Sequence, residues 1–431
     1  MDDASSDRGP PGALSHEMYE LSALDNAVQN YAWGSRSFLA EFLGRSVPSA
    51  KPEAELWMGA HPLAPSKLLT RAAAQDLRDL IATAPEAMLG PRVLNRFGPE
   101  LPYLMKVLAA AEPLSLQVHP SAAQAEAGFI REEGLGIPRT DPKRNYKDRR
   151  HKPELIVALT PFYALCGFRP IAHTRQLFAE LGSPALEPYA RALCTSDART
   201  ALRSSFSRLF DNAADTKKTL ARSVETAIRA ATTRPTSFRF ELEWARRIAD
   251  LYPGDVGLIA ALYLNVVRLE PGQALYLPAG NLHAYLEGAG LEIMASSDNV
   301  LRGGLTPKHV DMSELLEVLD FSELRVQRIE PLAREGEAVY PSPAAEFRLS
   351  RRDVEGAQQV AYSAAGEPRE QGRGNDCGPE VWLATQGEIT LSSCGGRQIA
   401  LRAGQSAFAP ACDPVDQVAG HGTAFIARVP N

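Results

Sequence analysis

The stretch YLPAGNLHAYLEG, residues 276–288, determines how this chain is interpreted. Its apolar, β-rich residues are interrupted by Pro278 and Gly280, residue types that form tight turns between strands. His283 follows the turn, where the return strand of a hairpin is expected to begin. Its imidazole is then expected to point inward from the sheet, where a neutral nitrogen is a good zinc ligand at about 2.0–2.1 Å.

Two other stretches offer companions for His283. In SLQVHP, Gln117 and His119 are separated by one residue, so on a strand their side chains share a face. In HKPEL, Glu154 directly precedes the apolar run LIVAL. One amide oxygen, two imidazoles and a carboxylate suit zinc or another borderline divalent metal. The spacing also fits a histidine that is merely hydrogen-bonded at a turn.

The composition is that of a globular protein. Of the 431 residues, 45% are hydrophobic and 23% charged, which allows two or three domains with ample cores. No apolar run approaches the ~20 residues of a membrane span, and residues 1–18 lack a signal-peptide pattern. We therefore expect a cytoplasmic protein with a disordered tail over 1–18. The net charge of −6 argues against a nucleic-acid-binding protein.

The cysteines indicate neither a disulfide framework nor a thiolate zinc site. Five are scattered along the chain without CxxC spacing. An odd, dispersed set is typical of reduced thiols. They are Cys166, Cys194, Cys377, Cys394 and Cys412.

Short apolar runs with Pro and Gly between them predict strands over 20–169, with one helical piece near 73–85. A helical insert is predicted at 171–251, where apolar residues recur at i, i+3, i+4 and i+7. Those residues are Val224, Ala227, Ile228 and Ala231. Strand character returns at 258–288 and continues after about residue 320, with a flexible loop at 364–380.

An internal echo links the two β-rich parts. The spacing Gly272-x5-Pro278 recurs as Gly404-x5-Pro410, but the position that would hold the histidine is Val415. The C-terminal copy therefore looks like the same β-unit without its ligand. Short strands and a repeat suggest antiparallel jelly-roll barrels. The predicted division is a tail (1–18), a catalytic β-domain (19–170 and 252–322), the helical insert (171–251) and a C-terminal β-domain (323–431).

The turn spacing resembles the second signature of the cupin jelly roll, and longer blocks resemble type I mannose-6-phosphate isomerases in that family's order. The blocks are YAWGS (31–35), AELWMGAHP (54–62), PYLMKVLAAAEPLSLQVHP (102–120), NYKDRRHKPEL (145–155), YLPAGNLHAYLEG (276–288) and GLEIMASSDNVLRGGLTPKHVD (290–311). The resemblance implies a catalytic cupin barrel, a ligand-free C-terminal barrel and one zinc ion per subunit. It implies an aldose–ketose isomerase that interconverts mannose 6-phosphate and fructose 6-phosphate and feeds mannose and GDP-mannose metabolism.

Matched position by position, the resemblance implies a set of site residues. The zinc ligands fall on Gln117, His119, Glu154 and His283. The residues of the reaction fall on Lys152, Glu292 and Arg302. Contacts to the phosphate of the substrate fall on Ser115, Lys106 and Lys308, and Tyr285 and His61 are further substrate-binding residues. The sequence departs from the family pattern at Arg149, Arg150 and Ser296. None of these is an implied metal ligand, so the departures affect the expected shape of the pocket rim rather than the expected metal site.

The chemistry makes demands that these residues can meet. Moving a proton between carbons 1 and 2 through a cis-enediol needs a base. Lys152, whose pKa neighbouring cations would lower, is the first choice, with Glu292 close behind. Arg302 offers a permanent charge to the enediolate, although a surface ion pair is its alternative.

Other side chains near these blocks have less specific roles. In the basic run KRNYKDRRHK (143–152), Lys147 and Arg150 are expected to attract the dianionic substrate. Solvated positions are expected for Lys143, Arg144 and Arg149. His61 has a packing role as its alternative. Trp33 and Trp57 are expected to pack beneath the site.

Two other classes of protein remain open. A cupin dioxygenase would need two histidines, one carboxylate and iron, and Gln117 counts against it. A non-catalytic sugar-phosphate sensor would keep the scaffold without turnover. We expect a monomer that acts on a small sugar phosphate, with no nucleic-acid or membrane partner.

Overall fold

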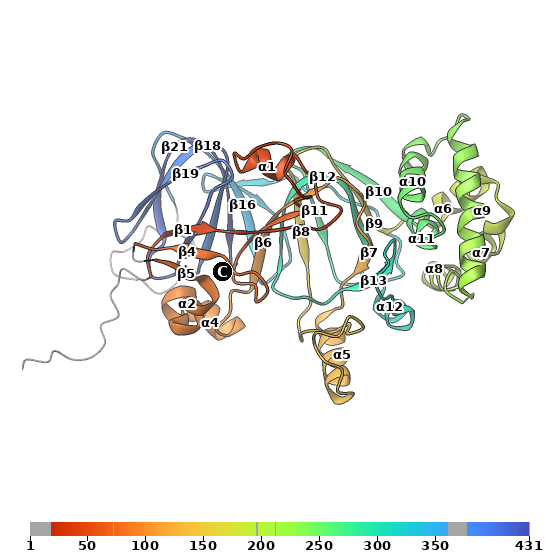
Figure 1. Cartoon of the computed structure of the whole chain (residues 1–431), viewed down its shortest axis with the longest axis horizontal. Helices are drawn as coiled ribbons and strands as arrows, with labels where there is room; N and C mark the ends of the chain where they lie inside the picture. Colours follow the sequence, from red (N-terminus) through yellow and green to blue (C-terminus); the bar gives the residue numbers. More distant parts are fainter. Residues whose placement is uncertain (1–18, 72, 195–196, 212, 361–376, 431) are drawn as a thin grey trace, which may run out of the picture.

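The structure is a computed structural model that describes residues 19–71, 73–194, 197–211, 213–360 and 377–430. The expected tail over 1–18 and most of the loop expected at 364–380 lie outside these residues. Two antiparallel β-sheets form the centre, and a group of helices lies at one end of the molecule (Figure 1). The predicted class, mainly β with helices, is confirmed. The cupin jelly-roll arrangement stays a prediction.

The ten-stranded sheet contains the candidate site. Its longest strand, β12 (His283–Ala295), begins with the histidine of the opening turn and pairs with four other strands of the sheet. A side chain on β12 can therefore face partners from several distant segments. The other strands are β2 (Ala27–Gln29), β3 (Glu55–Met58), β6 (Tyr103–Ala110), β7 (Leu116–Val118), β8 (Glu154–Ala158), β9 (Phe162–Phe168), β10 (Leu264–Leu269), β11 (Ala274–Leu277) and β13 (Leu301–Gly304).

The eleven-stranded sheet is built mostly from the C-terminal part of the chain. Those strands are β14 (Leu332–Arg334), β15 (Glu337–Tyr340), β16 (Arg348–Glu355), β17 (Gln358–Gln359), β18 (Glu380–Ser393), β19 (Gln398–Arg402), β20 (Ser406–Ala409) and β21 (Val415–Arg428). The β character expected after residue 320 is therefore confirmed in the described residues.

Three N-terminal strands complete this second sheet rather than the first. They are β1 (Ser22–Asp25), β4 (Lys67–Leu69) and β5 (Ala74–Asp76), and β1 pairs with β20. The predicted domain over 19–170 had placed them with the catalytic strands. Their pairing covers an edge of β20 that would otherwise expose unpaired backbone groups.

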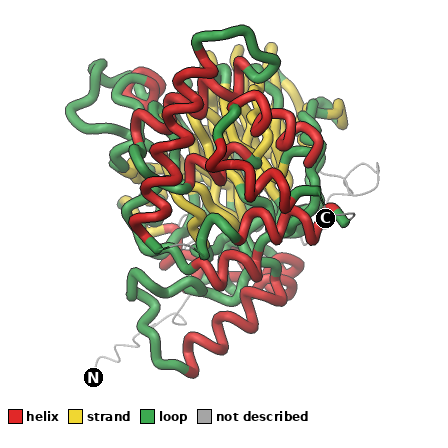
Figure 2. Tube along the Cα trace, turned by 90° about the vertical axis from the view of Figure 1, so that its right-hand side faces the viewer, coloured by secondary structure: helices red, strands yellow, loops and turns green. Residues whose placement is uncertain are grey.

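The helices predicted in the insert occur in the structure. They are α6 (Ile171–Leu181), α7 (Glu187–Ala192), α8 (Ala198–Ser207), α9 (Ala214–Thr232), α10 (Arg239–Leu251) and α11 (Gly257–Leu262). On α9, Val224, Ile228 and Ala231 are buried and Ala227 is half-buried, so the stripe is core, as expected. Viewed from their side, these helices lie in front of the strands (Figure 2). The domain boundaries themselves stay a prediction.

Further helices interrupt the first β-rich part. They are α1 (Phe38–Phe42), α2 (Leu77–Thr83), α3 (Pro85–Leu89), α4 (Pro91–Phe97) and α5 (Ala122–Gly134), followed later by α12 (Met312–Val318). The piece expected near 73–85 corresponds to α2, which begins later because Asp76 caps it. The sequence interpretation missed α5, although Ser121 and Gln124 form a capping box at its start. No helix in the described ranges is long and apolar enough to cross a membrane.

The turn before β12 requires its glycine. Gly280 has φ of 77°, a conformation that side chains disfavour, and an added Cβ would lie 3.1 Å from Asp320 Cβ. The Gly280 amide also donates to the carbonyl of His119 at 2.9 Å. The turn therefore ties the start of β12 to the residue that follows β7.

We expect Gly280→Ala to lower the free energy of unfolding by more than the ~1–2 kcal/mol typical of a left-handed backbone alone, because the new methyl group also meets Asp320. Urea denaturation measures the change. Gly396→Ala is the matched control, since Gly396 has φ of 83° with nothing within 4 Å of the added Cβ. Equal losses in the two variants would contradict the steric part of this account.

Candidate active site

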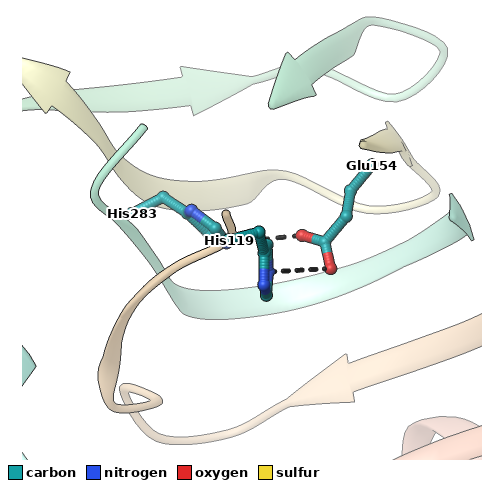
Figure 3. A group of neighbouring side chains, drawn as sticks. All are labelled: His119, Glu154 and His283. Carbon is teal, nitrogen blue, oxygen red and sulfur yellow. Dashed lines mark ion pairs between the residues drawn. The ribbon is translucent and has the colours of Figure 1, made fainter. Parts of the chain in front are cut away.

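Three side chains from distant segments meet in the interior. His119 Nε2 lies 3.2 Å from Glu154 Oε1, and His283 Nε2 lies 3.3 Å from Glu154 Oε2 (Figure 3). His119 follows β7, whereas Glu154 and His283 begin β8 and β12. All three are buried, and their ligand atoms lie within 4.8 Å of one another.

The hydrogen bonds of the two imidazoles fix which nitrogen carries the proton. His119 Nδ1 donates to the carbonyl of Asn299 at 2.7 Å, and His283 Nδ1 donates to the carbonyl of Asn281 at 2.9 Å. The Nε2 atoms therefore present lone pairs to Glu154. Among the described residues, neither Nε2 nor Glu154 Oε2 has a hydrogen-bond partner, although all three are buried. Three facing acceptors fit a divalent cation, with the carbonyls orienting the ligands.

The ionisation of these groups suits the same cation. Burial lowers the pKa of His119 to about 4, so its imidazole is neutral. Burial opposes the ionisation of Glu154, but the neighbouring Lys152 ammonium outweighs burial and holds the pKa of Glu154 well below its usual range. Lys152 Nζ lies 3.0 Å from Glu154 Oε1. Neutral imidazoles and an ionised carboxylate are the forms that bind a metal.

The sheet register places Gln117 beside this cluster. Gln117 on β7 is opposite His283 on β12 and also opposite Arg302 on β13. Residues directly opposite on paired strands project from the same face. The four predicted ligands and Arg302 are therefore brought to one region, although the assignment of Gln117 as a ligand stays a prediction.

A cavity of about 910 Å³ reaches the cluster at Glu154, whereas His119 and His283 are not among its lining residues. It is lined by most of the residues that the sequence predicted for the site: Lys106, Ser115, Gln117, Lys152, Glu154, Tyr285, Glu292, Arg302 and Lys308. Trp33 and Trp57 also line it, with Trp57 buried and Trp33 half-buried. Most of the site residues predicted from the sequence therefore line one cavity in the structure.

His61 does not line this cavity. It lies against a neighbouring cavity of about 670 Å³, where its Nε2 is 3.2 Å from Asp298 Oδ1. Its Nδ1 accepts from the amide of Leu63 at 3.2 Å. These contacts match the alternative in which His61 orients loops.

A second polar row crosses the cavity wall. Glu292 on β12 is opposite Lys106 on β6, and Lys106 Nζ lies 3.4 Å from Glu292 Oε2 and 3.6 Å from Glu55 Oε2. Tyr285 donates its hydroxyl to Glu292 Oε1 at 2.7 Å. Burial raises the pKa of Glu292, as does Glu154, while Lys106 works in the opposite direction. The sequence interpretation did not single out Glu55, whose only local signal is its place in the AELWMGAHP block.

Positive charge gathers at another part of the wall. Arg302, Lys308 and Lys147 line the cavity, and in the described part of the chain no carboxylate lies within ion-pair distance of them. Burial lowers the pKa of Lys308, and Arg302 and Lys147 lower it further. Cations that repel one another beside a cavity suit an anionic ligand.

The loop that carries Lys147 is held by residues that the sequence did not predict. Asn299 Oδ1 accepts from the Lys147 amide at 2.7 Å, and its Nδ2 donates to the Asp148 carbonyl at 2.8 Å. Asn299 therefore positions both this loop and, through its own carbonyl, His119. Its signal was the SSDN segment (296–299) within the last block that resembles the family.

The predictions for the basic run 143–152 met different outcomes. Lys143 and Arg149 are exposed, as expected. The solvated position expected for Arg144 is wrong, because its buried guanidinium pairs with Glu132 and Glu133 at the end of α5. Arg150 pairs with Glu100 at 2.5 Å beside the neighbouring cavity. Its role in attracting substrate stays a prediction.

Comparison with known proteins explains why these groups occur together. Residues 21–171 match the family described as phosphomannose isomerase type I, catalytic domain. Mannose-6-phosphate isomerase of Escherichia coli K12 is 38% identical over 95% of this chain and 100% of its own length. The chain belongs to the mannose-6-phosphate isomerase family. The human relative is 32% identical over 78% of this chain and 82% of its own.

Solved structures show the same relationship. A mannose 6-phosphate isomerase structure described as holo and zinc-bound has a TM-score of 0.84 and 35% identity, and covers 96% of this chain and 100% of that one. A variant of phosphomannose isomerase from Salmonella typhimurium gives a TM-score of 0.85 at 35% identity, with coverage of 96% and 100%. The fold, over 96% of the chain, is therefore shared with this family.

We expect His283→Ala to lose the metal ion and the activity, because it removes one of three converging ligand atoms. Zinc content measured by elemental analysis after gel filtration checks the first loss. His309→Ala is the control, since His309 lines the same cavity outside the cluster and should leave the zinc content unchanged. Full zinc occupancy in the His283 variant would contradict the assignment.

Proposed function

We propose that this protein interconverts mannose 6-phosphate and fructose 6-phosphate through a cis-enediol. The observation that carries the proposal is the His119–Glu154–His283 cluster, whose unsatisfied ligand atoms face one another beside a cavity that also holds Glu292 and Arg302. The names of the relatives and a zinc-bound relative support it. As a cytoplasmic monomer it would feed mannose and GDP-mannose metabolism.

One zinc ion per subunit would be held by Gln117, His119, Glu154 and His283. When bound, zinc supplies Lewis-acid stabilisation to the negative charge that develops on the sugar oxygens. Lys152, at 3.0 Å from Glu154, stabilises the ionised form of that ligand.

Glu292 is the base that the contacts favour for the proton on carbon. Lys152, the first choice from the sequence, has its ammonium directed at Glu154, whereas Glu292 lines the cavity with a raised pKa. A buried carboxylate with a raised pKa is a better base than an exposed one. Arg302 then stabilises charge on the enediolate oxygens, a role that a preorganised donor fills well.

Phosphate binding is proposed for the positively charged part of the wall. Lys308 and Lys147 lie there, and Ser115 offers a hydroxyl nearby in the lining of the cavity. Lys106 was also expected to contact phosphate, but its ammonium already has two carboxylate neighbours. Gripping the phosphate away from carbons 1 and 2 fixes the orientation of the sugar.

We expect the zinc-loaded protein to convert mannose 6-phosphate, with phosphoglucose isomerase and glucose-6-phosphate dehydrogenase reporting the product as NADPH. Chelation should abolish the signal, and added zinc should restore it without any need for oxygen. The absence of turnover by zinc-replete protein would favour a sensor, and dependence on oxygen and iron would favour a dioxygenase.

We expect Arg302→Ala to keep its zinc yet lower kcat by about 10²-fold, the cost of removing a preorganised charge donor. Steady-state kinetics and zinc analysis on the same sample measure both. Arg149→Ala, an exposed cation outside the cavity, is the control. A change in KM alone would show that Arg302 only binds substrate.

The pH profile tests Glu292. A base acts in its ionised form, so the raised pKa of Glu292 should make kcat/KM fall on acidification at a pH above the ~4.3 of an ordinary glutamate. Zinc content must be measured at each pH, because protonated ligands would release the metal. Retained activity in Glu292→Gln would exclude this residue as the base.

A further inference from the structure

The Lys106 ammonium lies between two carboxylates and forms a close hydrogen bond with neither. Its Nζ is 3.6 Å from Glu55 Oε2 and 3.4 Å from Glu292 Oε2. Both distances exceed the ~2.7–2.9 Å of a direct charge-assisted hydrogen bond. The ammonium is therefore shared between the two carboxylates, and it also lies 5.1 Å from the centre of the Trp57 ring.

Glu55 is itself held in place. The indole Nε1 of Trp57 donates to Glu55 Oε2 at 2.6 Å, and both side chains are buried where they line the cavity. A tryptophan packed in this way has little freedom, so the carboxylate that it holds has little freedom either. At the other end of the row, Tyr285 holds Glu292 Oε1.

The C-terminal sheet contains a similar set of groups, a tryptophan, two carboxylates and a cation, but there the distances between the cation and the carboxylates are shorter. Trp382 Nε1 donates to Glu380 Oε2 at 2.7 Å, and Arg428 contacts Glu380 at 2.6 Å and Glu337 at 2.7 Å. There the cation is a permanently charged arginine in direct contact with both carboxylates. The register also differs, since Arg428 is opposite Glu380 whereas Lys106 is opposite Trp57.

We propose that Glu55, locked by the indole of Trp57, is a positioning residue that holds Lys106 back from Glu292 and so leaves the Glu292 carboxylate free to accept the substrate proton. This inference rests on the proposed function of Glu292. Without Glu55, Glu292 would be the one carboxylate of the described residues left within 4 Å of the Lys106 ammonium, and a direct ion pair would form. A carboxylate tied to an ammonium is a weaker base.

The inference predicts a loss in kcat rather than in binding. We expect Glu55→Gln to lower kcat by about tenfold or more, because small displacements of active-site groups reduce the rate by factors of this order. KM for mannose 6-phosphate, the zinc content and the melting temperature should stay close to those of the wild type. Trp57→Phe keeps an aromatic ring but removes the N–H donor, and it should lower kcat in the same way by a smaller factor.

The C-terminal set provides matched controls. Glu380→Gln and Trp382→Phe make the same chemical changes far from the cavity, so they should leave kcat unchanged whatever they do to the melting temperature. Unchanged kcat in a folded Glu55→Gln variant would overturn the inference. So would a loss of kcat in a folded variant that follows a loss of zinc.

The failure of this inference is distinguishable from failure of the proposed function. If wild-type protein with zinc does not turn over mannose 6-phosphate, the proposed function is wrong. If the wild type is active and Glu55→Gln is equally active, only the role of Glu55 is wrong. Should Glu55→Gln fail to fold, Trp57→Phe tests the same contact from its other partner.

Discussion

Three buried acceptor atoms that face one another set the main constraint on this structure. The Nε2 atoms of His119 and His283 and a carboxylate oxygen of Glu154 cannot satisfy one another, because the proton of each imidazole is on Nδ1. Such an arrangement is costly without a cation. Other features near the site hold these ligands: the glycine turn before β12, the carbonyls of Asn281 and Asn299, and the Lys152 ion pair.

The sequence predicted the parts of the site that depend on local geometry. A turn followed by His283, and the alternation of Gln117 and His119, predict candidate ligands without any knowledge of strand pairing. The longer blocks then identified the family. What could not be predicted depends on partners far apart in the chain. Glu55 comes close to Lys106 because β3 and β12 both pair with β6. The register of that pairing could not be predicted from the sequence.

The errors have the same origin. Arg144 looked solvated in a basic run, but α5 was not predicted, and its acidic residues Glu132 and Glu133 bury the guanidinium. The strands β1, β4 and β5 were assigned by proximity in sequence, yet they pair with the C-terminal sheet. In both cases a contact between distant segments overrode the local pattern.

The pairing of β1 with β20 has a consequence for how the two halves of the chain relate. The C-terminal part has Val415 where the first copy has its histidine, so it lacks the corresponding candidate ligand. Removing residues 323–431 would nevertheless take away β20, one of the two neighbours of β1, and expose unpaired backbone groups along that edge. The second β-region thus completes the sheet that contains β1, β4 and β5, and segments from both ends of the chain stabilise each other there.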